Sequence, residues 1–263
     1  MVLGAMGYGY LVEPYSIEIQ HLSIEDSAFT SVLGGKRMVQ ISDLHLSASC
    51  GLEGEVLRIL DKIDPDLLFL TGDYVKWSGD YAVALNFLSK LKARYGVWAV
   101  MGDYDYSRPR NSCCFCHEEG TAKPTQRHRV KFLRNAWERV EFEGGALWIG
   151  GIDEVALRPF PPDTNWLPVE ERAPAIVLGH SPLSFDLFSE EEKVLFLAGD
   201  THGGQIPLPS RLWQAIGYEK NARYNHGFFE LGQKRMFVSR GIGTSHVPFR
   251  FMAKPEIVVI DFR

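Results

Sequence analysis

The fold is decided by the segment MVQISDLH, residues Met38–His45, in which a short apolar run passes directly into a carboxylate and an imidazole. The pattern recurs along the chain, because Asp or His also follows the runs Leu67–Leu70, Val97–Met101, Ala175–Leu178 and Val194–Ala198. Apolar runs of this length are typical of buried strands. Ligands bind beyond the carboxyl ends of strands in α/β sheets, so we expect these polar side chains to gather in one cluster.

The segments between and after these runs indicate the remaining elements. Glu55–Ile63 and Ala82–Leu91 carry apolar residues at helical spacing, which predicts two crossover helices. Gly227–Leu231, Met236–Ser239 and Glu256–Phe262 are short and β-rich, which predicts adjacent antiparallel or mixed strands. We therefore predict an α/β fold, a four-layer α/β/β/α sandwich of two mixed sheets with flanking helices.

Length and charge limit the organisation of the chain and its partners. A chain of 263 residues with 45% hydrophobic content is long enough for one large domain with a full core, so we assign residues 1–263 to one domain. The formal net charge of -5 is unlike the basic surface of a nonspecific nucleic-acid binder. We expect a small phosphorylated substrate and no duplex nucleic acid.

The N-terminus is uncharged and mostly apolar over residues 1–12. This run is shorter than the roughly 20 residues of a spanning helix, and it lacks the basic start of a signal peptide. One interpretation is an apolar segment that packs on the domain. The other is the remnant of a longer membrane anchor, which predicts peripheral membrane contact through the N-terminus. The corresponding locations are the cytoplasm, or a peripheral or anchored position at the bacterial membrane.

Together, the ordered motifs resemble those of the calcineurin-like metallophosphoesterases, and more closely the bacterial branch that often carries an N-terminal membrane anchor. The motifs are Asp43-Leu44-His45, Gly72-Asp73, Gly179-His180-Ser181-Pro182 and Thr201-His202-Gly203-Gly204-Gln205. The resemblance covers almost the whole chain. It implies a first metal held by Asp43, His45, Asp73 and His202. It also implies that Asp73 bridges to a second metal, which His180, Asp103 and Asp200 complete.

Such a site has a defined chemistry. A bridging carboxylate can hold two cations roughly 3.5 to 4 Å apart, so that a shared water ionises near neutral pH and attacks phosphorus in line. The resemblance thus implies a metal-dependent phosphohydrolase that cleaves a phosphomonoester, phosphodiester or pyrophosphate bond. The expected cofactors are two divalent ions, Mn, Fe, Mg or Zn. The expected substrate is a phosphorylated small molecule or a lipid-linked phosphate.

Two departures from the family pattern affect the second metal. The family usually shows Gly-Asn-His-Asp and Gly-His-x-His, where this chain has Gly102–Asp105 and Gly199–His202. Asp103 and Asp200 thus replace neutral ligands, and four carboxylates would formally cancel the charge of two divalent cations. This change favours Mn, Mg, Fe or Ca over Zn at the second position. Without metal, the clustered carboxylates should repel one another and raise some of their pKa values.

The first departure also places Tyr104 where the family has a catalytic His. A phenol can donate a hydrogen bond but titrates poorly at neutral pH. We predict a catalytic set of Tyr104, Asp105 and Asp73, in which Asp105 orients Tyr104. Activity should then be low, or restricted to substrates with good leaving groups. The alternative is a catalytically weakened protein on the same fold, a metal, redox or haem-binding sensor.

The cysteines form a second unusual feature. Three of them lie in the unpatterned segment 107–129, which reads as a loop insertion at the active-site face, and Cys50 follows the Asp43-Leu44-His45 motif, so all four should lie on that face. The segment CCFCH contains C-x-x-C-H, the pattern that attaches c-type haem. A thiolate site for Zn²⁺ or an iron cluster is a second interpretation. Reduced thiols in a lid loop, or a disulfide, are a third. The candidate cofactor-binding residues are Cys50, Cys113, Cys114, Cys116 and His117.

Basic and aromatic residues suggest where a substrate lies. Guanidinium groups pair bidentately with phosphate, and the candidates are Arg108, Arg110, Arg240 and Arg250. Solvated surface charge is the default interpretation of each one. An ordinary loop histidine is the favoured interpretation of His246. Five aromatic residues line either an apolar groove for a lipid-linked phosphate or the core: Trp213, Tyr218, Tyr224, Phe228 and Phe229.

Overall fold

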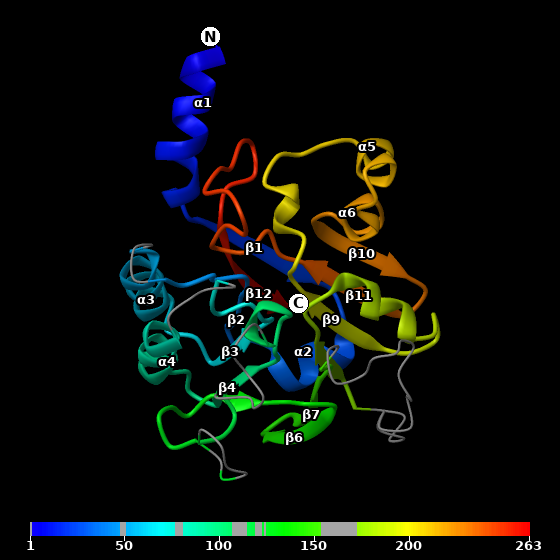
Figure 1. Ribbon diagram of the computed structural model, residues 1–263. Coiled ribbons are helices and arrows are strands. Elements are labelled where there is room, and N and C mark those ends of the chain that lie inside the picture. Colours follow the sequence, from blue (N-terminus) through cyan, green and yellow to red (C-terminus); the bar gives the residue numbers. More distant parts are fainter. Residues whose placement is uncertain are drawn as a thin grey trace.

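The computed structural model describes residues 2–47, 51–76, 81–106, 115–118, 123, 125–153 and 173–263. Within these ranges, twelve strands form two sheets of six strands each, with flanking helices. This arrangement is the α/β sandwich of two mixed sheets that the sequence predicts (Figure 1).

The first sheet has the strand order β1-β12-β2-β3-β4-β5. Its strands are β1 (Glu18–Ile24), β12 (Glu256–Phe262), β2 (Met38–Ile41), β3 (Leu67–Leu70), β4 (Gly96–Ala99) and β5 (Lys131–Phe132). The strands β2 to β5 are parallel, whereas β12 runs antiparallel to β2. The carboxyl ends of β2, β3 and β4 therefore lie at one edge of the sheet.

The second sheet has the strand order β10-β11-β9-β8-β7-β6. Its strands are β10 (Gly227–Leu231), β11 (Lys234–Val238), β9 (Val194–Ala198), β8 (Ala175–Leu178), β7 (Gly145–Gly151) and β6 (Ala136–Phe142). The four central strands are parallel, and antiparallel strands form both edges. All residues of β8 and β9 are buried, as expected of parallel strands covered on both faces.

The two sheets share one hydrophobic core. Met38, Phe69 and Val258 of the first sheet belong to the same buried cluster as Ile176 and Leu197 of the second. The helix α2 (Ser27–Leu33) adds its apolar face to this cluster. The sheets therefore pack face to face. The assignment of the whole chain to one domain stays a prediction.

Helices cover the outer faces. On the first sheet, α3 (Leu52–Ile63) and α4 (Tyr81–Lys90) pack Val56 and Leu88 against Val39 and Ile41 (Figure 1). On the second, the 3-10 helix η3 (Pro182–Leu187) joins a separate buried cluster with β8 and β9. The remaining short elements are η2 (Tyr104–Tyr106), η4 (His202–Gly204), α5 (Ser210–Ala215) and α6 (Glu219–Arg223).

The elements that the sequence predicts are present, with one correction to their pairing. The apolar runs appear as β2, β3, β4, β8 and β9, and the two crossover helices as α3 and α4. β10 and β11 are antiparallel neighbours, as expected. The expectation that β12 lies beside them is wrong, because β12 pairs with β1 and β2 in the other sheet. Its fully apolar centre suits either sheet, so local pattern alone does not choose the partner.

The N-terminal segment packs on the domain. It forms the helix α1 (Val2–Leu11) and the 3-10 helix η1 (Glu13–Tyr15), and α1 extends from the top of Figure 1. The carbonyl of Gly9 accepts a hydrogen bond from the Arg250 amide at 3.0 Å. The carboxylate of Glu13 accepts one from the Ala253 amide at 2.6 Å. In the part of the chain that the structure describes, no helix is long and apolar enough to cross a bilayer.

Candidate metal centre

The polar loops that follow five strands meet at the carboxyl ends of both sheets. The first sheet contributes the residues after β2, β3 and β4, and the second contributes those after β8 and β9. Backbone hydrogen bonds join neighbouring loops, since the Asp43 amide donates to the Gly72 carbonyl at 3.0 Å and the His45 amide to the Asp73 carbonyl at 2.9 Å. The ligand candidates therefore sit on loops that rigid strands hold in register.

The backbone of these loops is strained. Five candidate ligands adopt the left-handed region, with φ of 50° at Asp43, 44° at His45, 58° at Asp73, 72° at Asp200 and 53° at His202. Residues other than glycine seldom adopt this conformation, and those that do cluster at functional sites. The strain turns several side chains into one small volume, which is a reason for a function beyond packing.

Glycine permits one of the closest approaches in the cluster. A Cβ atom at Gly102 would lie 2.1 Å from the carboxylate oxygen Oδ1 of Asp73. The loop after β4 can therefore approach the Asp73 carboxylate only because residue 102 has no side chain.

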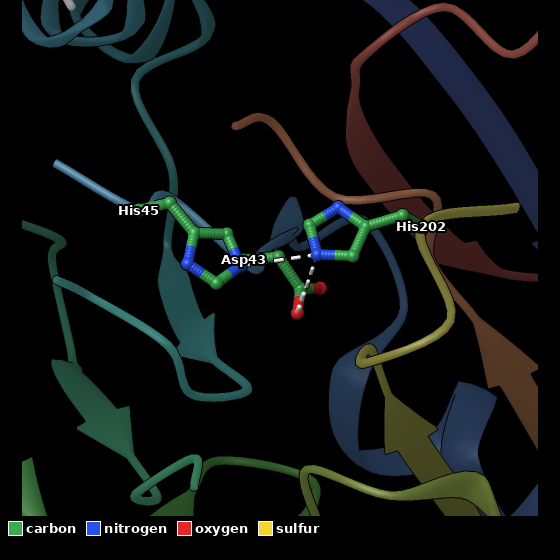
Figure 2. A group of neighbouring side chains, drawn as sticks. All are labelled: Asp43, His45 and His202. Carbon is green, nitrogen blue, oxygen red and sulfur yellow. Dashed lines mark hydrogen bonds and ion pairs between the residues drawn. The ribbon is translucent and has the colours of Figure 1, made fainter. Parts of the chain in front are cut away.

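Asp43, His45 and His202 form the first ligand group (Figure 2). The Nε2 atoms of the two imidazoles lie 3.0 Å apart, and the rings are stacked with centroids 4.9 Å apart. Oδ1 of Asp43 lies 3.8 Å from Nε2 of His202. All three side chains are buried. Their donor atoms face a common point, as Figure 2 shows.

Asp73 lies between this group and His180. Its Oδ2 atom is 3.5 Å from Nε2 of His45 and also 3.5 Å from Nε2 of His180. Asp43, Asp73 and His180 form the second group whose donor atoms lie within 4.8 Å of one another. Asp43 thus belongs to both groups, and Asp73 is equidistant from a histidine of each. The two groups therefore share the Asp43 carboxylate, and the Asp73 carboxylate lies between their histidines.

The donor set fits metal ions. Two donors at about 2.1 Å from one ion lie about 3 to 4 Å apart, which matches the spacing of these atoms. Among the described residues, the buried Nε2 atom of His180 has no hydrogen-bond partner. Its Nδ1 atom lies 2.8 Å from the Thr71 carbonyl, which fixes the proton there and directs the Nε2 lone pair into the site.

The histidines differ in their readiness to bind a cation. Burial lowers the pKa of His45 and of His202, so both imidazoles are neutral at neutral pH. Burial also lowers the pKa of His180, but the charge of Asp73 and the contact with Asp103 outweigh it and raise this pKa well above its usual range. Without metal, His180 therefore carries a proton that an ion must displace.

The pKa values of Asp43 and Asp103 shift in opposite directions. The sequence predicts raised pKa values in the cluster, and of these two only that of Asp43 is raised. Burial, reinforced by the charge of Asp73, raises the pKa of Asp43 to about 7. Asp103 has a half-exposed side chain whose Oδ1 lies 3.6 Å from Nε2 of His180. Burial raises the pKa of Asp103, but the close contact and charge of His180 outweigh it, so this pKa lies below its usual range. Burial thus dominates at Asp43, with repulsion by Asp73 a smaller contribution, and attraction to His180 dominates at Asp103.

Asp200 has a cationic neighbour that sequence reasoning missed. Its Oδ1 lies 3.9 Å from Nε2 of His180, and its amide donates to the Asp43 carboxylate at 3.0 Å. The ammonium group of Lys220 donates to Oδ1 of Asp200 at 2.7 Å and also contacts Oδ2. Lys220 therefore adds one positive charge to the centre, beside the four carboxylates of Asp43, Asp73, Asp103 and Asp200. A lysine on a separate short helix carries no local signal of this role.

Asp105 holds the loops rather than the tyrosine. Oδ2 of its buried carboxylate accepts hydrogen bonds from the amides of Asp73 and Gly102, each at 2.8 Å. Oδ1 accepts one from the Tyr74 amide at 2.8 Å. Burial and the charge of Asp73 raise the pKa of Asp105 well above its usual range, although the amide hydrogen bonds oppose this shift. The expectation that Asp105 orients the Tyr104 hydroxyl is not met in the hydrogen bonds described, whereas its position behind Asp73 is central to the site.

Tyr104 lies over the first group. Its ring stands edge-on to His45, with centroids 4.8 Å apart, and its amide donates to Oδ1 of Asp73 at 3.0 Å. Burial, reinforced by the charge of Asp73, raises the pKa of Tyr104 to about 12, so the hydroxyl keeps its proton at neutral pH. The hydroxyl lies 3.2 Å from Nε2 of His246. His246 is thus close to the site, although the sequence suggested an ordinary loop residue.

Two arginines proposed for phosphate binding have structural roles. Arg250 is fully buried, and its guanidinium donates to the carbonyls of Gly243 and Ala253. Arg240 is ion-paired with Glu256 and Glu18. The prediction that these arginines bind substrate phosphate is therefore wrong, because their donors are used by the protein itself. Arg108 and Arg110 lie outside the described residues.

The aromatic residues divide between groove and core. Trp213 and Tyr218 line a groove beside the site. Tyr224 and Phe229 instead belong to the buried cluster on the outer face of the second sheet. Phe228 is partly exposed on β10 and does not line this groove.

The cysteine predictions are mostly outside the described residues, since Cys50, Cys113 and Cys114 have no described placement. Cys116 is partly buried against the core beside α3 and α4. The metal-ligand groups found in the described part of the chain contain neither Cys116 nor His117. The haem, thiolate-metal and thiol interpretations stay predictions.

Comparisons with known proteins agree with this geometry. The family model described as calcineurin-like phosphoesterase matches residues 36–204. The uncharacterized metallophosphoesterase YkuE of Bacillus subtilis is 28% identical over 269 residues, which cover 99% of this chain and 90% of that protein. The UDP-2,3-diacylglucosamine pyrophosphatase LpxG of Chlamydia muridarum is 24% identical, over 95% of this chain and 90% of its own. The phosphodiesterase YaeI of Escherichia coli is 25% identical, over 86% and 81% respectively.

Proposed function

This chain belongs to the calcineurin-like phosphoesterase family, and we propose that it cleaves a phosphomonoester, phosphodiester or pyrophosphate bond at a centre of two divalent metal ions. Membership of the family makes it a metal-dependent hydrolase of phosphoric esters. The number of ions, the residues that hold them and the kind of bond cleaved are the proposal.

One observation carries the proposal, the position of the Asp73 carboxylate. Its Oδ2 atom lies 3.5 Å from a histidine nitrogen on each side, His45 and His180. A single carboxylate placed between two nitrogen donors, with further donors beyond each, is the arrangement that supports a bridged pair of cations. Asp43, His45, Asp73 and His202 would hold one ion. Asp73, His180, Asp103 and Asp200 would hold the other.

The bound ions would supply Lewis acidity and lower the pKa of water at the site. The chain's own residues do the remaining work. Thr71 and the loop backbone orient His180, and Asp105 fixes the Asp73 loop through its amide hydrogen bonds. The Tyr104 hydroxyl, protonated at neutral pH, can donate a hydrogen bond to a phosphoryl or leaving-group oxygen. His246 lies next to this hydroxyl and can support it.

The charge balance differs from that expected of the carboxylates alone. Four carboxylates formally cancel two divalent cations, and the Lys220 ammonium restores one positive charge beside Asp200. A centre with a net positive charge attracts a phosphate anion better than a neutral one does. We therefore assign Lys220 to the electrostatic attraction of substrate phosphate.

The relatives indicate the kind of substrate. One is named as a pyrophosphatase of UDP-2,3-diacylglucosamine and another as a phosphodiesterase. For this chain we infer a phosphorylated small-molecule or lipid-linked substrate. The weakened sensor that binds metal without hydrolysis is the rival function.

Hydrolysis of chromogenic substrates tests the proposal. Purified protein is loaded with Mn²⁺, Fe²⁺, Mg²⁺ or Zn²⁺ and assayed with p-nitrophenyl phosphate, bis-p-nitrophenyl phosphate and a nucleotide pyrophosphate, while elemental analysis counts bound metal. We expect two ions per chain, and an Asp73→Asn variant that loses at least about 100-fold in kcat/KM because the bridge is broken. Asp61→Asn is the matched control, since Asp61 is an exposed acid on α3.

The results separate the two functions. Two bound ions without hydrolysis of any substrate would favour the sensor. One bound ion with activity that Asp73→Asn leaves intact would show that no bridged pair is needed, and the proposed site would be wrong.

A further inference from the structure

A groove of about 610 Å³ opens beside the candidate metal centre. Its inner end is formed by the ligand loop after β9, at Asp200, Thr201 and His202. Lys220 and His246 also line it. Its size is within the range of pockets that hold small molecules, so it can take more of a substrate than one phosphate group.

The outer walls of the groove are apolar. The helix α1 contributes Met6 and Tyr10, and the segment around α5 contributes Trp213 and Ile216. Met6 is 49% exposed and Ile216 is 56% exposed. Exposed apolar side chains that gather around a groove indicate a surface that binds an apolar ligand. The groove thus has a charged inner end and an apolar outer part.

The N-terminal helix is built into this wall. The ring of Tyr10 lies edge-on to Phe249, with centroids 4.8 Å apart, and Phe249 also lines the groove. A Cβ atom at Gly9 would lie 2.3 Å from the Phe249 ring, so the helix approaches this loop closely only at a glycine. The apolar character of α1 therefore has a use within the domain, as one side of the groove.

We propose that this groove binds the alkyl chain of an amphiphilic phosphate ester whose phosphate lies at the centre formed around Asp43 and Asp73. The inference rests on the proposed function, because the phosphate position is that of the hydrolytic site. The continuity of the groove supports this one occupant. The proposed metal ions lie beside Asp200 at the inner end of this groove, so a ligand that reaches from them to the Met6 and Ile216 walls joins an anionic group to an apolar one.

Binding of two phosphonates tests the proposal, since their P–C bond resists hydrolysis. Methylphosphonate and octylphosphonate are titrated calorimetrically into the Mn²⁺-loaded protein, at concentrations where octylphosphonate is monomeric. A fully buried methylene contributes about a factor of four to affinity. If half of the seven added carbons are buried, octylphosphonate binds about 100-fold more tightly than methylphosphonate.

Variants with matched controls test where the octyl chain of the ligand binds. Met6→Asp and Ile216→Asp place a charge in the groove wall at partly exposed positions, and each should weaken octylphosphonate binding at least about 10-fold without changing methylphosphonate binding. The controls are Leu11→Asp on α1 and Leu212→Asp on α5, which are 76% and 51% exposed and do not line the groove. These controls should bind both phosphonates as the unmodified chain does. Circular dichroism checks that all four variants are folded.

Each other result overturns the proposal. Equal affinity for the two phosphonates would mean that no alkyl chain is bound. Equal losses of octylphosphonate affinity in the groove variants and in their controls would mean that the octyl chain binds elsewhere on the apolar surface. If Met6→Asp instead converts a dimer into a monomer in sedimentation and leaves octylphosphonate affinity unchanged, the groove holds a second copy of the chain.

Failure of the proposed function gives a different result. Hydrolysis of p-nitrophenyl phosphate measures the metal centre without an alkyl chain. Absence of hydrolysis, combined with tight octylphosphonate binding that Ile216→Asp weakens, would contradict the proposed hydrolytic function and support binding of the alkyl chain in the groove. Hydrolysis of p-nitrophenyl phosphate together with equal affinities for octylphosphonate and methylphosphonate would support the proposed hydrolytic function and contradict binding of an alkyl chain in the groove.

Discussion

Replacing Asp105 by asparagine should damage both stability and metal binding. The carboxylate is buried and accepts three hydrogen bonds at 2.8 Å, from the amides of Asp73, Tyr74 and Gly102. An asparagine oxygen in the position of Oδ2 can still accept from two of these amides. The NH₂ group would then face the Tyr74 amide, which is also a donor, so one buried N–H loses its acceptor.

The size of the effect follows from these contacts. A buried donor without a partner costs about 1 to 3 kcal/mol, and two hydrogen bonds that change from charged to neutral acceptors lose about 0.5 to 1 kcal/mol each. The total is about 3 kcal/mol, which corresponds to a decrease in Tm of about 6 to 10 °C for a chain of this length. Because the same bonds hold the loop of the bridging Asp73, Mn²⁺ affinity should fall about 10- to 100-fold.

Thermal unfolding and metal titration of Asp105→Asn measure both effects. The control is Asp61→Asn, which removes the same charge from a side chain that is 62% exposed and paired with Lys92. The control should stay within about 0.5 kcal/mol of the unmodified chain. A Tm within about 2 °C of the unmodified chain, together with unchanged Mn²⁺ affinity, would show that Asp105 does not act through the Asp73 loop.

Four further predictions concern metal, charge and the residues over the site. Chelation should lower Tm, because the clustered carboxylates then face one another without an ion, and equal melting curves with and without chelator would contradict this. In the chelated protein, the stability contributed by Asp43 should be lost as the pH rises from about 4 to about 7, because burial raises its pKa from 3.8 to about 7 and the folded state holds a proton there that the unfolded state has released. The ion held by His45 and His202 should bind before the ion held by His180. Its binding should release fewer protons, since the pKa values of His45 and His202 are lowered and that of His180 is raised. Calorimetry in buffers of different ionisation enthalpy measures the protons released at each step. Lys220→Met should tighten the second ion and raise KM for a phosphomonoester about 10-fold, and an unchanged KM would argue against its role in attracting phosphate. His246→Ala should lower kcat for substrates with poor leaving groups more than for p-nitrophenyl phosphate, which parallel assays of both substrate kinds compare.

Much of the fold and the proximity of the candidate ligands could be predicted because the relevant signals are local. Strands β3, β8 and β9 coincide with uninterrupted apolar runs, and β2 coincides with a run that only Gln40 interrupts. Each candidate ligand follows an apolar run within a few residues. Because parallel strands end at the same edge of a sheet, the side chains that follow them are expected at that edge. Asp43, His45, Asp73, His180 and His202 could therefore be assigned to one place before any contact was known.

Partners distant in the chain could not be predicted in this way. Lys220 reaches Asp200 across 20 residues, and His246 reaches Tyr104 across 142. The pairing of β12 with β1 and β2 joins the two ends of the chain. Nothing in the residues next to these positions shows which surface they will meet, because packing of the complete sheets decides it.

The order of residues along the chain supplies the donors of a metal centre, because carboxylates and imidazoles follow the buried strands. The packing of the two sheets sets how these donors are used. It placed Asp73 between His45 and His180, turned Asp105 toward backbone amides, and set an apolar helix beside the ligand loop. The physical reason is that residue type and strand pattern act over a few positions, whereas distance and charge at a site are set by segments that meet only when both sheets pack.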